Sequence, residues 1–308
     1  MRCIKMLYAL YVTGFSLAKV LPLRAAYFIA EAVARSYYLF AKKDREAVKA
    51  NLRVILGENA SDAVLERHVL DIFRNFAKYL ADFFKFPRFT RDFIKRNIDI
   101  VGLENLDRCL EKGKGVVLTA LHLGNWELGG AIMRPINYPI TAIALEHPDR
   151  RINDFFRRQR LKNRMKSIPI RQRSVDDLRS IPMSVQIKEC FKVLRNNGLL
   201  VIVGDKDYTS TGIDVDFFGR KAVMPKGPAA FSLKTGAPIV VSVLTREKGD
   251  RFKLCFEPPV EFKPTGNYPR DLRSLMGKYI TLFEKYISKY PDQWYAFRKI
   301  WKQEERTP

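Results

Sequence analysis

A histidine and a carboxylate five positions apart are the residues of this chain best suited to acid–base chemistry. His122 and Glu127 lie in the stretch VVLTALHLGNWELGGAI, which runs from an apolar strand through a short loop into a helix. An imidazole accepts a proton at one ring nitrogen most effectively when a carboxylate accepts the N–H of the other. We therefore predict that Glu127 orients His122 as a general base. The nucleophile would be a hydroxyl of the substrate, because no Ser or Cys adjoins His122 and the chain contains no G-x-S-x-G elbow.

The spacing of this pair is not diagnostic by itself. With 33 acidic residues among 308 and three histidines, a pair of this kind arises by accident in roughly one chain in three. The alternative is a histidine satisfied by backbone in a turn, with Glu127 stabilising a helix N-terminus. The context favours a site, because Gly124 loosens the turn and Asn125 is a good N-cap for the helix that follows.

Three ordered sequence blocks resemble one known family. The segment HLGNWE resembles the H-x4-D/E signature of the lysophospholipid acyltransferase superfamily, in the form found in lipid A biosynthesis acyltransferases. The stretch VIVGDKDYTSTGIDVDFFGRKAVMPKGPAAFSLKTGAPIV, from Val201 to Val240, is similar to that family's second block, and YPDQWYAF, from Tyr290 to Phe297, to its closing motif. An N-terminal pattern that includes Asn51 is also similar, so the resemblance covers nearly the whole chain.

The resemblance implies an activity and roles for individual residues. Members transfer a fatty acyl group from a thioester, usually on acyl carrier protein, to a hydroxyl of a lipid-linked sugar at the cytoplasmic face of the bacterial inner membrane. By resemblance, His122 is the base, Glu127 its catalytic partner, and Arg160 an arginine near them. Substrate contacts are expected from Asn125, Arg160, Asp205, Gly219 and Arg220.

Two departures from the family pattern affect these assignments. Asn163 and Arg164 stand where members often carry Gly, which bears on the local geometry and on the role of Arg160. Lys206 replaces a Gln often found between two acids, so the active-site acid is either Asp205 or Asp207, and its position favours Asp205.

The second block can also be interpreted from its residues alone. The apolar run before Gly204 predicts a buried strand that ends in a polar loop, which places Asp205 at a strand end. The segment FFGRK, residues 217–221, combines apolar surface with two cations and a Gly. It could form a wall that holds acyl chain and phosphate together, or a hairpin with solvent-facing cations.

Apolar strand candidates alternate with helical stretches along the chain, which predicts an α/β fold with a central mixed sheet layered by helices. The expected strands are residues 99–101, 116–119, 141–145, 199–203, 239–244 and 253–256. The expected helices are residues 69–84, 153–165, 184–196 and 269–289. No linker or repeat divides the chain after residue 50, so we predict a helical membrane-anchoring segment, 1–50, and one acyltransferase domain, 51–308.

The N-terminal segment is amphipathic. Met6 to Ala18 is a run of 13 uncharged residues, shorter than the roughly 20 that span a bilayer. It could be a signal peptide, but Lys19 and Arg24 follow it, and a thioester donor would be available in the cytoplasm. Residues 25–40 mix aromatic and charged side chains, which suits a membrane interface. We predict an interfacial anchor or a short hairpin dipping into the membrane.

A formal net charge of +22 favours anionic partners. An anionic membrane surface and an acidic carrier protein both fit, whereas nucleic acid is not expected because no recognisable binding motif is present. The four cysteines are far apart without a C-x-x-C pair, so neither a disulfide framework nor a zinc site is indicated. We expect no metal and no cofactor.

The expected reaction is direct transfer from an acyl carrier protein or coenzyme A thioester to a glycolipid acceptor, without an acyl-enzyme. The acceptor would be a lipid A precursor or a similar glycolipid; a glycerophosphate or a phosphatidylinositol mannoside is the alternative. A catalytically silent membrane or nucleic-acid binding protein on the same fold is the alternative from another class.

Overall fold

A mixed β-sheet forms the centre of the molecule. The computed structural model describes residues 12–18, 20–85, 90–147, 149–170 and 183–301. Within them, seven strands form one sheet in the order β1-β9-β8-β2-β5-β3-β4. The strands are β1 (Ile98–Val101), β2 (Val116–Ala120), β3 (Ile140–Leu145), β4 (Lys166–Ile170), β5 (Leu199–Val203), β8 (Ile239–Arg246) and β9 (Phe252–Phe256). Only β8 and β9 pair antiparallel in this sheet. The predicted α/β class with a mixed sheet is confirmed.

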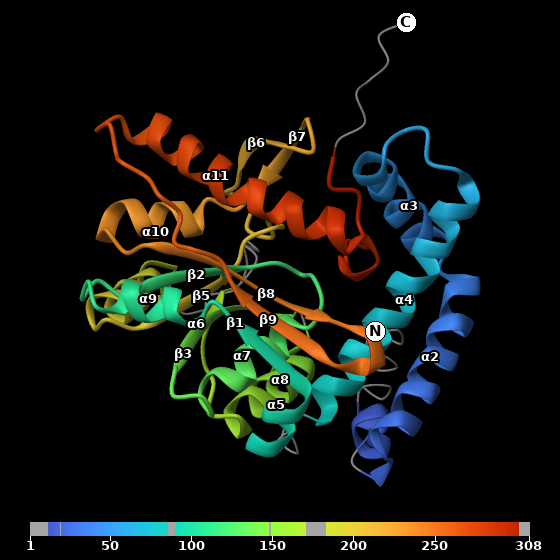
Figure 1. The fold of residues 1–308 in the computed structure, drawn as a ribbon. Helices are drawn as coiled ribbons and strands as arrows, with labels where there is room; N and C mark the ends of the chain where they lie inside the picture. Colours follow the sequence, from blue (N-terminus) through green and yellow to red (C-terminus); the bar gives the residue numbers. More distant parts are fainter. Residues whose placement is uncertain (1–11, 19, 86–89, 148, 171–182, 302–308) are drawn as a thin grey trace, which may run out of the picture.

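Helices cover both faces of this sheet. They are α5 (Arg91–Asn97), α6 (Leu103–Leu110), α7 (Trp126–Met133), α8 (Arg150–Lys162), α9 (Met183–Arg195), α10 (Gly227–Thr235) and α11 (Tyr268–Lys289). In Figure 1, α10 and α11 lie above the sheet, and α5, α7 and α8 lie below it. All five residues of β2 are buried, because a central parallel strand is covered on both faces, and this is why it reads as a continuous apolar run.

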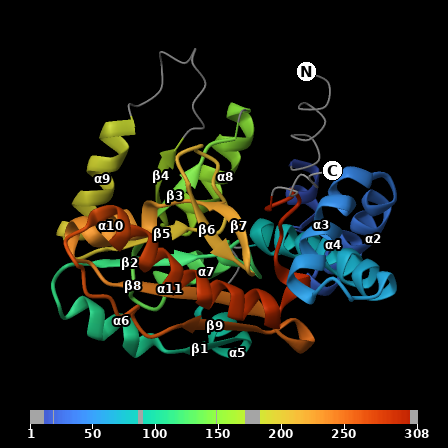
Figure 2. The same cartoon turned by 90° about the horizontal axis from the view of Figure 1, so that it is seen from above.

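Three further helices stand beside the sheet. They are α2 (Leu23–Phe40), α3 (Lys42–Leu56) and α4 (Asp62–Lys85), and α2 and α3 pack on α4 (Figure 2). Asn51 ties α3 to the C-terminal segment, because its Nδ2 donates to the carbonyls of Ala296 at 3.0 Å and Arg298 at 2.8 Å. The predicted boundary at residue 50 falls inside α3, and the division into two domains stays a prediction.

The amphipathic stretch predicted at residues 25–40 corresponds to α2. Large apolar side chains are exposed along this helix, among them Phe28, Val33, Leu39 and Phe40. Of the apolar stretch 6–18, residues 12–18 are helical and residues 6–11 lie outside the described residues. No helix in the described ranges is both long and apolar enough to cross a membrane.

The predicted strands and long helices lie where expected, with shifted ends. Helix α8 begins at Arg150 rather than residue 153, because the side chain of Asp149 caps it by accepting from the backbone N–H of Arg151. Strand β4 was not predicted. Its sequence KSIPI contains a proline, which is tolerated because β4 lies at the edge of the sheet.

Candidate active site

The register of two central strands brings His122 and Asp205 together. Strands β2 and β5 are parallel neighbours, with Ala120 opposite Val203 at their carboxyl ends. His122 and Asp205 each follow two residues after these positions, so both side chains emerge at the same edge of the sheet. Nδ1 of His122 lies 2.6 Å from Oδ1 of Asp205. The carboxyl edge of parallel strands is where α/β proteins place their ligands.

The pair is held in a buried environment that favours a neutral imidazole beside a charged carboxylate. Burial lowers the pKa of His122 from its usual 6.5 more than the facing carboxylate raises it. Although burial alone would raise the pKa of Asp205, the facing His122, the Lys206 ammonium and the indole N–H of Trp294 hold it well below its ordinary value. Trp294 Nε1 donates to Oδ2 of Asp205 at 2.8 Å. At neutral pH, His122 therefore has Nδ1 engaged with Asp205, which leaves Nε2 to accept a proton.

Residues of the closing motif YPDQW hold the loop that follows β2 and contains His122. Tyr295 N–H donates to the carbonyl of His122 at 2.9 Å, and Gly124 N–H donates to the carbonyl of Gln293 at 2.9 Å. The amide side chain of Gln293 bonds to both the N–H and the carbonyl of Arg246 on β8. The bond from Trp294 to Asp205 was not predicted. The only signal for it in the sequence was that Trp294 lies in the third block that resembles the family.

Replacing Trp294 by Phe should weaken the site. The change leaves Oδ2 of the fully buried Asp205 without its indole donor, which should cost about 1–3 kcal/mol of unfolding free energy. Trp301→Phe is the matched control, since it also removes a buried indole bond, to the carbonyl of Phe217 at 2.9 Å, but no bond to Asp205 or to the loop that holds His122. Trp294→Phe should change both the free energy of unfolding, measured in urea, and the pH profile of acyl transfer. The control should change only the free energy of unfolding.

Glu127 has a different partner from the one predicted. It lies in the first turn of α7, buried, and forms a two-pronged ion pair with Arg160 of α8, with Nε 3.1 Å from Oε2. Although burial opposes the charge, Glu127 raises the pKa of Arg160 above its ordinary value. The prediction that Glu127 is the carboxylate that orients His122 is therefore wrong: Asp205 contacts Nδ1 of His122, and Arg160 binds Glu127. A catalytic role for Glu127 stays a prediction.

Asn125 and Gly124 shape the start of α7. The side-chain oxygen of Asn125 accepts from Leu128 N–H at 3.0 Å, and its Nδ2 donates to the buried Asp82 at 2.8 Å. Both ends of the amide are used within the protein, so the structure gives Asn125 a capping role, and substrate binding by it stays a prediction. Gly124 has φ 63°, and a Cβ there would lie 1.9 Å from the carbonyl oxygen of Leu244, so only glycine fits.

The Asn163-Arg164 departure leaves Arg160 in place. Helix α8 ends in a Schellman motif, in which Met165 N–H donates to the carbonyl of Arg160 and Arg164 N–H to that of Leu161. Arg164 has φ 54°, in the left-handed region that Gly usually occupies at this position of a Schellman motif. An L-residue adopts this conformation at a cost of about 1–2 kcal/mol. The backbone at the end of α8 therefore has the conformation that a glycine at residue 164 would adopt, and it carries an arginine side chain there.

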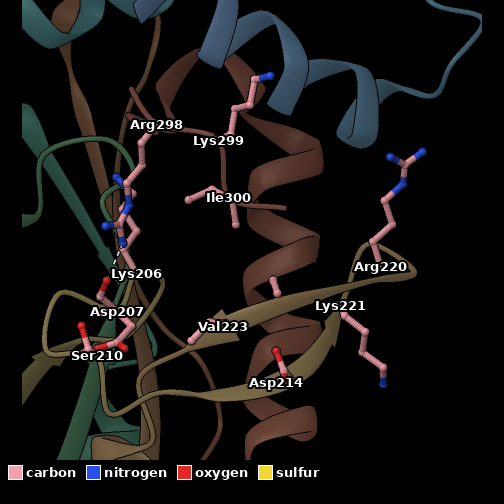
Figure 3. Close-up of a pocket in the computed structure, with 11 residues that line it drawn as sticks. Lys206, Asp207, Ser210, Asp214, Arg220, Lys221, Val223, Arg298, Lys299 and Ile300 are labelled. Atoms are coloured by element: carbon pink, nitrogen blue, oxygen red, sulfur yellow. Dashed lines mark hydrogen bonds between the residues drawn. The ribbon is translucent and has the colours of Figure 1, made fainter. Parts of the chain in front are cut away.

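A cavity of about 560 Å³, lined mostly by charged residues, lies next to Asp205, because Lys206 and Asp207 both line it. Figure 3 shows Lys206 and Arg298 on one wall, and Arg220 and Lys221 on the hairpin formed by β6 (Ile213–Phe217) and β7 (Arg220–Met224). Burial lowers the pKa of Lys206 to about 8, although Asp205 opposes this. The lining of the cavity contains five basic and two acidic side chains: Lys206, Arg220, Lys221, Arg298 and Lys299, with Asp207 and Asp214. The excess of cations suits a phosphate-bearing ligand.

For residues 217–221, the sequence left open a cationic wall or a hairpin, and the structure contains both. Phe218 and Gly219 form the two-residue turn with φ 52° and 69°, the pattern of a type I′ hairpin turn. Gly219 therefore provides the turn, while Arg220 lines the cavity and pairs with Glu58 at 2.6 Å. Their part in substrate binding stays a prediction.

Comparison with known proteins identifies a family and several relatives of this chain. The family model described as bacterial lipid A biosynthesis acyltransferase matches residues 2–303. The chain belongs to this family. Two curated relatives are phosphatidylinositol mannoside acyltransferases. The one from Mycolicibacterium smegmatis is 24% identical over 94% of this chain and 90% of its own length; that from Mycobacterium tuberculosis is 26% identical over 83% of this chain and 77% of its own length.

In this acyltransferase, the predicted site residues fall into separate groups. His122 and Asp205 are in direct contact, and Glu127 and Arg160 are in direct contact. Arg220 lines the neighbouring cavity together with Lys206. An apolar cavity of about 30 Å³ lies between α7 and the sheet, and Trp126, whose ring lies 5.0 Å from that of His122, lines it. Among the described residues, no group of three or more His, Cys, Asp or Glu side chains is arranged to hold a metal ion.

Proposed function

We propose that this acyltransferase moves a fatty acyl group from a thioester to a sugar hydroxyl of a phosphate-bearing glycolipid. The observation that carries the proposal is the 2.6 Å contact between Nδ1 of His122 and Asp205, which leaves Nε2 as a neutral base. The imidazole is partly accessible, with 20% of its side-chain surface exposed. A substrate hydroxyl is the group that such a base can activate.

The reaction is a direct transfer. The acceptor hydroxyl gives its proton to Nε2 of His122 while its oxygen forms a bond to the thioester carbonyl carbon. The tetrahedral intermediate collapses as the carbon–sulfur bond breaks, and the imidazolium returns the proton to the leaving thiolate. Asp205 stabilises the transient imidazolium. No acyl-enzyme forms, so acylated protein that survives denaturation would contradict this version.

The start of α7 is suited to stabilise the oxyanion. The first amides of a helix have no intrahelical acceptor, and of these the Leu128 N–H is already bonded to Asn125. The amides of Trp126 and Glu127 are the candidates, close to His122 in the chain and at the positive end of the helix. The Glu127–Arg160 pair would hold this helix end in place against α8.

The two cavities suit the two kinds of substrate surface. The cationic cavity beside Lys206 would receive a phosphate of the carrier or of the glycolipid. The apolar cavity beside Trp126 contains Gly129, Gly130 and Met133 and would open to accept the acyl chain, since methionine side chains adapt readily. The exposed apolar residues of α2 would place the enzyme on the cytoplasmic surface of the bacterial inner membrane.

Acyl transfer by detergent-purified protein tests the proposal. Acyl carrier protein and coenzyme A thioesters would be offered with a lipid A precursor and, separately, with a phosphatidylinositol mannoside, the acceptor named for the mycobacterial relatives. We expect transfer to one of these acceptors, reduced by His122→Ala about 10²-fold or more. His147→Ala, which changes an exposed histidine, is the control and should leave the rate unchanged. Transfer unaffected by His122→Ala would contradict the mechanism.

A further inference from the structure

A shallow basic depression lies away from the catalytic pair. It has a volume of about 620 Å³ and is formed where the first residue of α5 and the ends of α7 and α8 meet. Its cations are Arg91, Arg134, Lys162 and Arg164, and no acidic residue lines it. None of these four side chains forms an ion pair with another residue in the described part of the chain, although many exposed arginines elsewhere do, such as Arg53 with Asp62 at 2.8 Å. The depression therefore concentrates uncompensated positive charge.

The backbone around the depression keeps an arginine where glycine would be less strained. Arg164 occupies the left-handed position of the Schellman motif. Asn137, which also lines the depression, has positive φ as well, at 72°. A side chain retained against a backbone preference suggests that the side chain itself has a use. The use that fits an exposed, unpaired guanidinium beside three further cations is binding of an anion.

An apolar surface adjoins the depression. The Lys162 ammonium lies 5.3 Å from the ring centroid of Phe15, which packs edge-on against Phe155 of α8. Phe15 belongs to the helical residues 12–18, where Val12 and Leu17 are exposed. Cations next to exposed apolar side chains of a helix are the combination that binds a bilayer with anionic headgroups. A soluble anion would have no use for the apolar part.

We propose that the depression formed by Arg91, Arg134, Lys162 and Arg164 binds the phosphate of an anionic phospholipid in the membrane on which residues 12–18 rest. The site is separate from the cationic cavity of the catalytic region, to which none of the four residues contributes. It fixes which face of the enzyme meets the bilayer. The inference concerns membrane docking, and it can be tested whether or not the proposed acceptor is correct.

Vesicle flotation tests the proposal with the full chain. The vesicles contain phosphatidylcholine alone or phosphatidylcholine with phosphatidylglycerol, and the variant carries Arg91→Gln, Arg134→Gln, Lys162→Gln and Arg164→Gln. The control variant removes the same number of charges from the opposite side of the molecule, on or next to α11 (Figure 1), through Lys263→Gln, Arg270→Gln, Arg273→Gln and Lys278→Gln.

Affinity for phosphatidylglycerol vesicles should fall by about 10²–10³-fold in the depression variant, since each cation near an anionic surface contributes roughly fivefold. The control should lose much less. Acyl transfer to a detergent-dispersed acceptor should be retained in both. An equal loss in both variants would mean that net charge alone attracts the membrane. Unchanged binding of the depression variant, or displacement of the wild-type protein by inorganic phosphate alone, would also overturn the proposal.

Arg164→Gly separates folding from binding at this site. Glycine suits the left-handed backbone at residue 164, so the variant should unfold at a higher temperature than the wild type. Its affinity for phosphatidylglycerol vesicles should nevertheless fall about fivefold. A more stable protein that binds these vesicles as well as the wild type would remove Arg164 from the site.

Discussion

Asp205→Asn should reduce acyl transfer by about 10²–10⁴-fold while leaving the protein folded. The carboxylate of Asp205 accepts from His122 Nδ1 and from Trp294 Nε1. An amide of the same shape can present N–H to Nδ1, which would favour the wrong tautomer and leave Nε2 protonated instead of basic. It also removes the negative charge that stabilises the imidazolium. The loss should therefore appear in kcat, with little change in binding of either substrate.

The Asp205→Asn change should also shift the pH dependence of acyl transfer in a defined direction. His122 must be neutral to act as a base, and burial lowers its pKa below 6.5. In the wild type, kcat/KM should therefore fall on acidification with a midpoint below about 6.5. Asp205 raises the pKa of His122 by its charge, although burial outweighs it. In Asp205→Asn, residual activity should consequently fall at a still lower pH than in the wild type.

Asp207→Asn is the matched control. Asp207 is two residues away, but its oxygens accept from the backbone N–H groups of Thr209 and Gly212 at 2.9 Å, not from His122. Its replacement should cost much less activity and leave the acid limb where it is. If Asp207→Asn moved the acid limb and Asp205→Asn did not, the assignment of the orienting carboxylate would be reversed.

The positions of the strands along the chain could be predicted from sequence, whereas their order in the sheet could not. The apolar runs that became β2 and β5 were identified closely, and His122 and Asp205 were both placed at strand ends. Contact between the two side chains depends on β2 lying next to β5, although β3 and β4 separate them in the chain. A crossover of this kind leaves no local periodicity. Sequence reasoning therefore chose Glu127, the acid nearest in the chain, as the partner of His122.

Residues whose role depends on long-range bonds were the hardest to assign. Glu127 forms its ion pair with an arginine 33 positions away, and Trp294 donates to an acid 89 positions away. Family resemblance marked both segments as important without defining the contacts. By contrast, Asn125 was correctly expected to cap α7, because capping depends only on the next three residues.

A buried network around Asp82 joins the N-terminal helices to the catalytic loop. Asp82 of α4 is fully buried and bonds to Tyr27 of α2, Arg246 of β8 and Asn125 at the start of α7. The side chain of Arg246 is only 9% exposed, and its guanidinium also lies over the ring of Tyr27. One carboxylate therefore fixes elements from three parts of the fold.

Asp82→Ala should lower the free energy of unfolding by about 3–5 kcal/mol, because it removes the fully buried counter-charge of the Arg246 guanidinium and leaves only the partly exposed Asp250, 3.2 Å away. Glu66→Ala is the matched control: Glu66 also binds a tyrosine and a cation, Tyr38 at 2.7 Å and Lys49 at 2.9 Å, but nearly half of its side chain is exposed. Glu66→Ala should lower the free energy of unfolding by about 1 kcal/mol or less.

Urea unfolding of the double variant Asp82→Ala with Arg246→Met tests the physical reason for the larger effect. If the loss in Asp82→Ala comes from an uncompensated buried charge, removing Arg246 as well should restore part of the stability. A double variant less stable than either single variant would mean that Asp82 and Arg246 stabilise the fold through their other partners. In that case, the hydrogen bonds to Tyr27 and Asn125 would account for the effect, since they join α2 and the catalytic loop without any contribution from the ion pair.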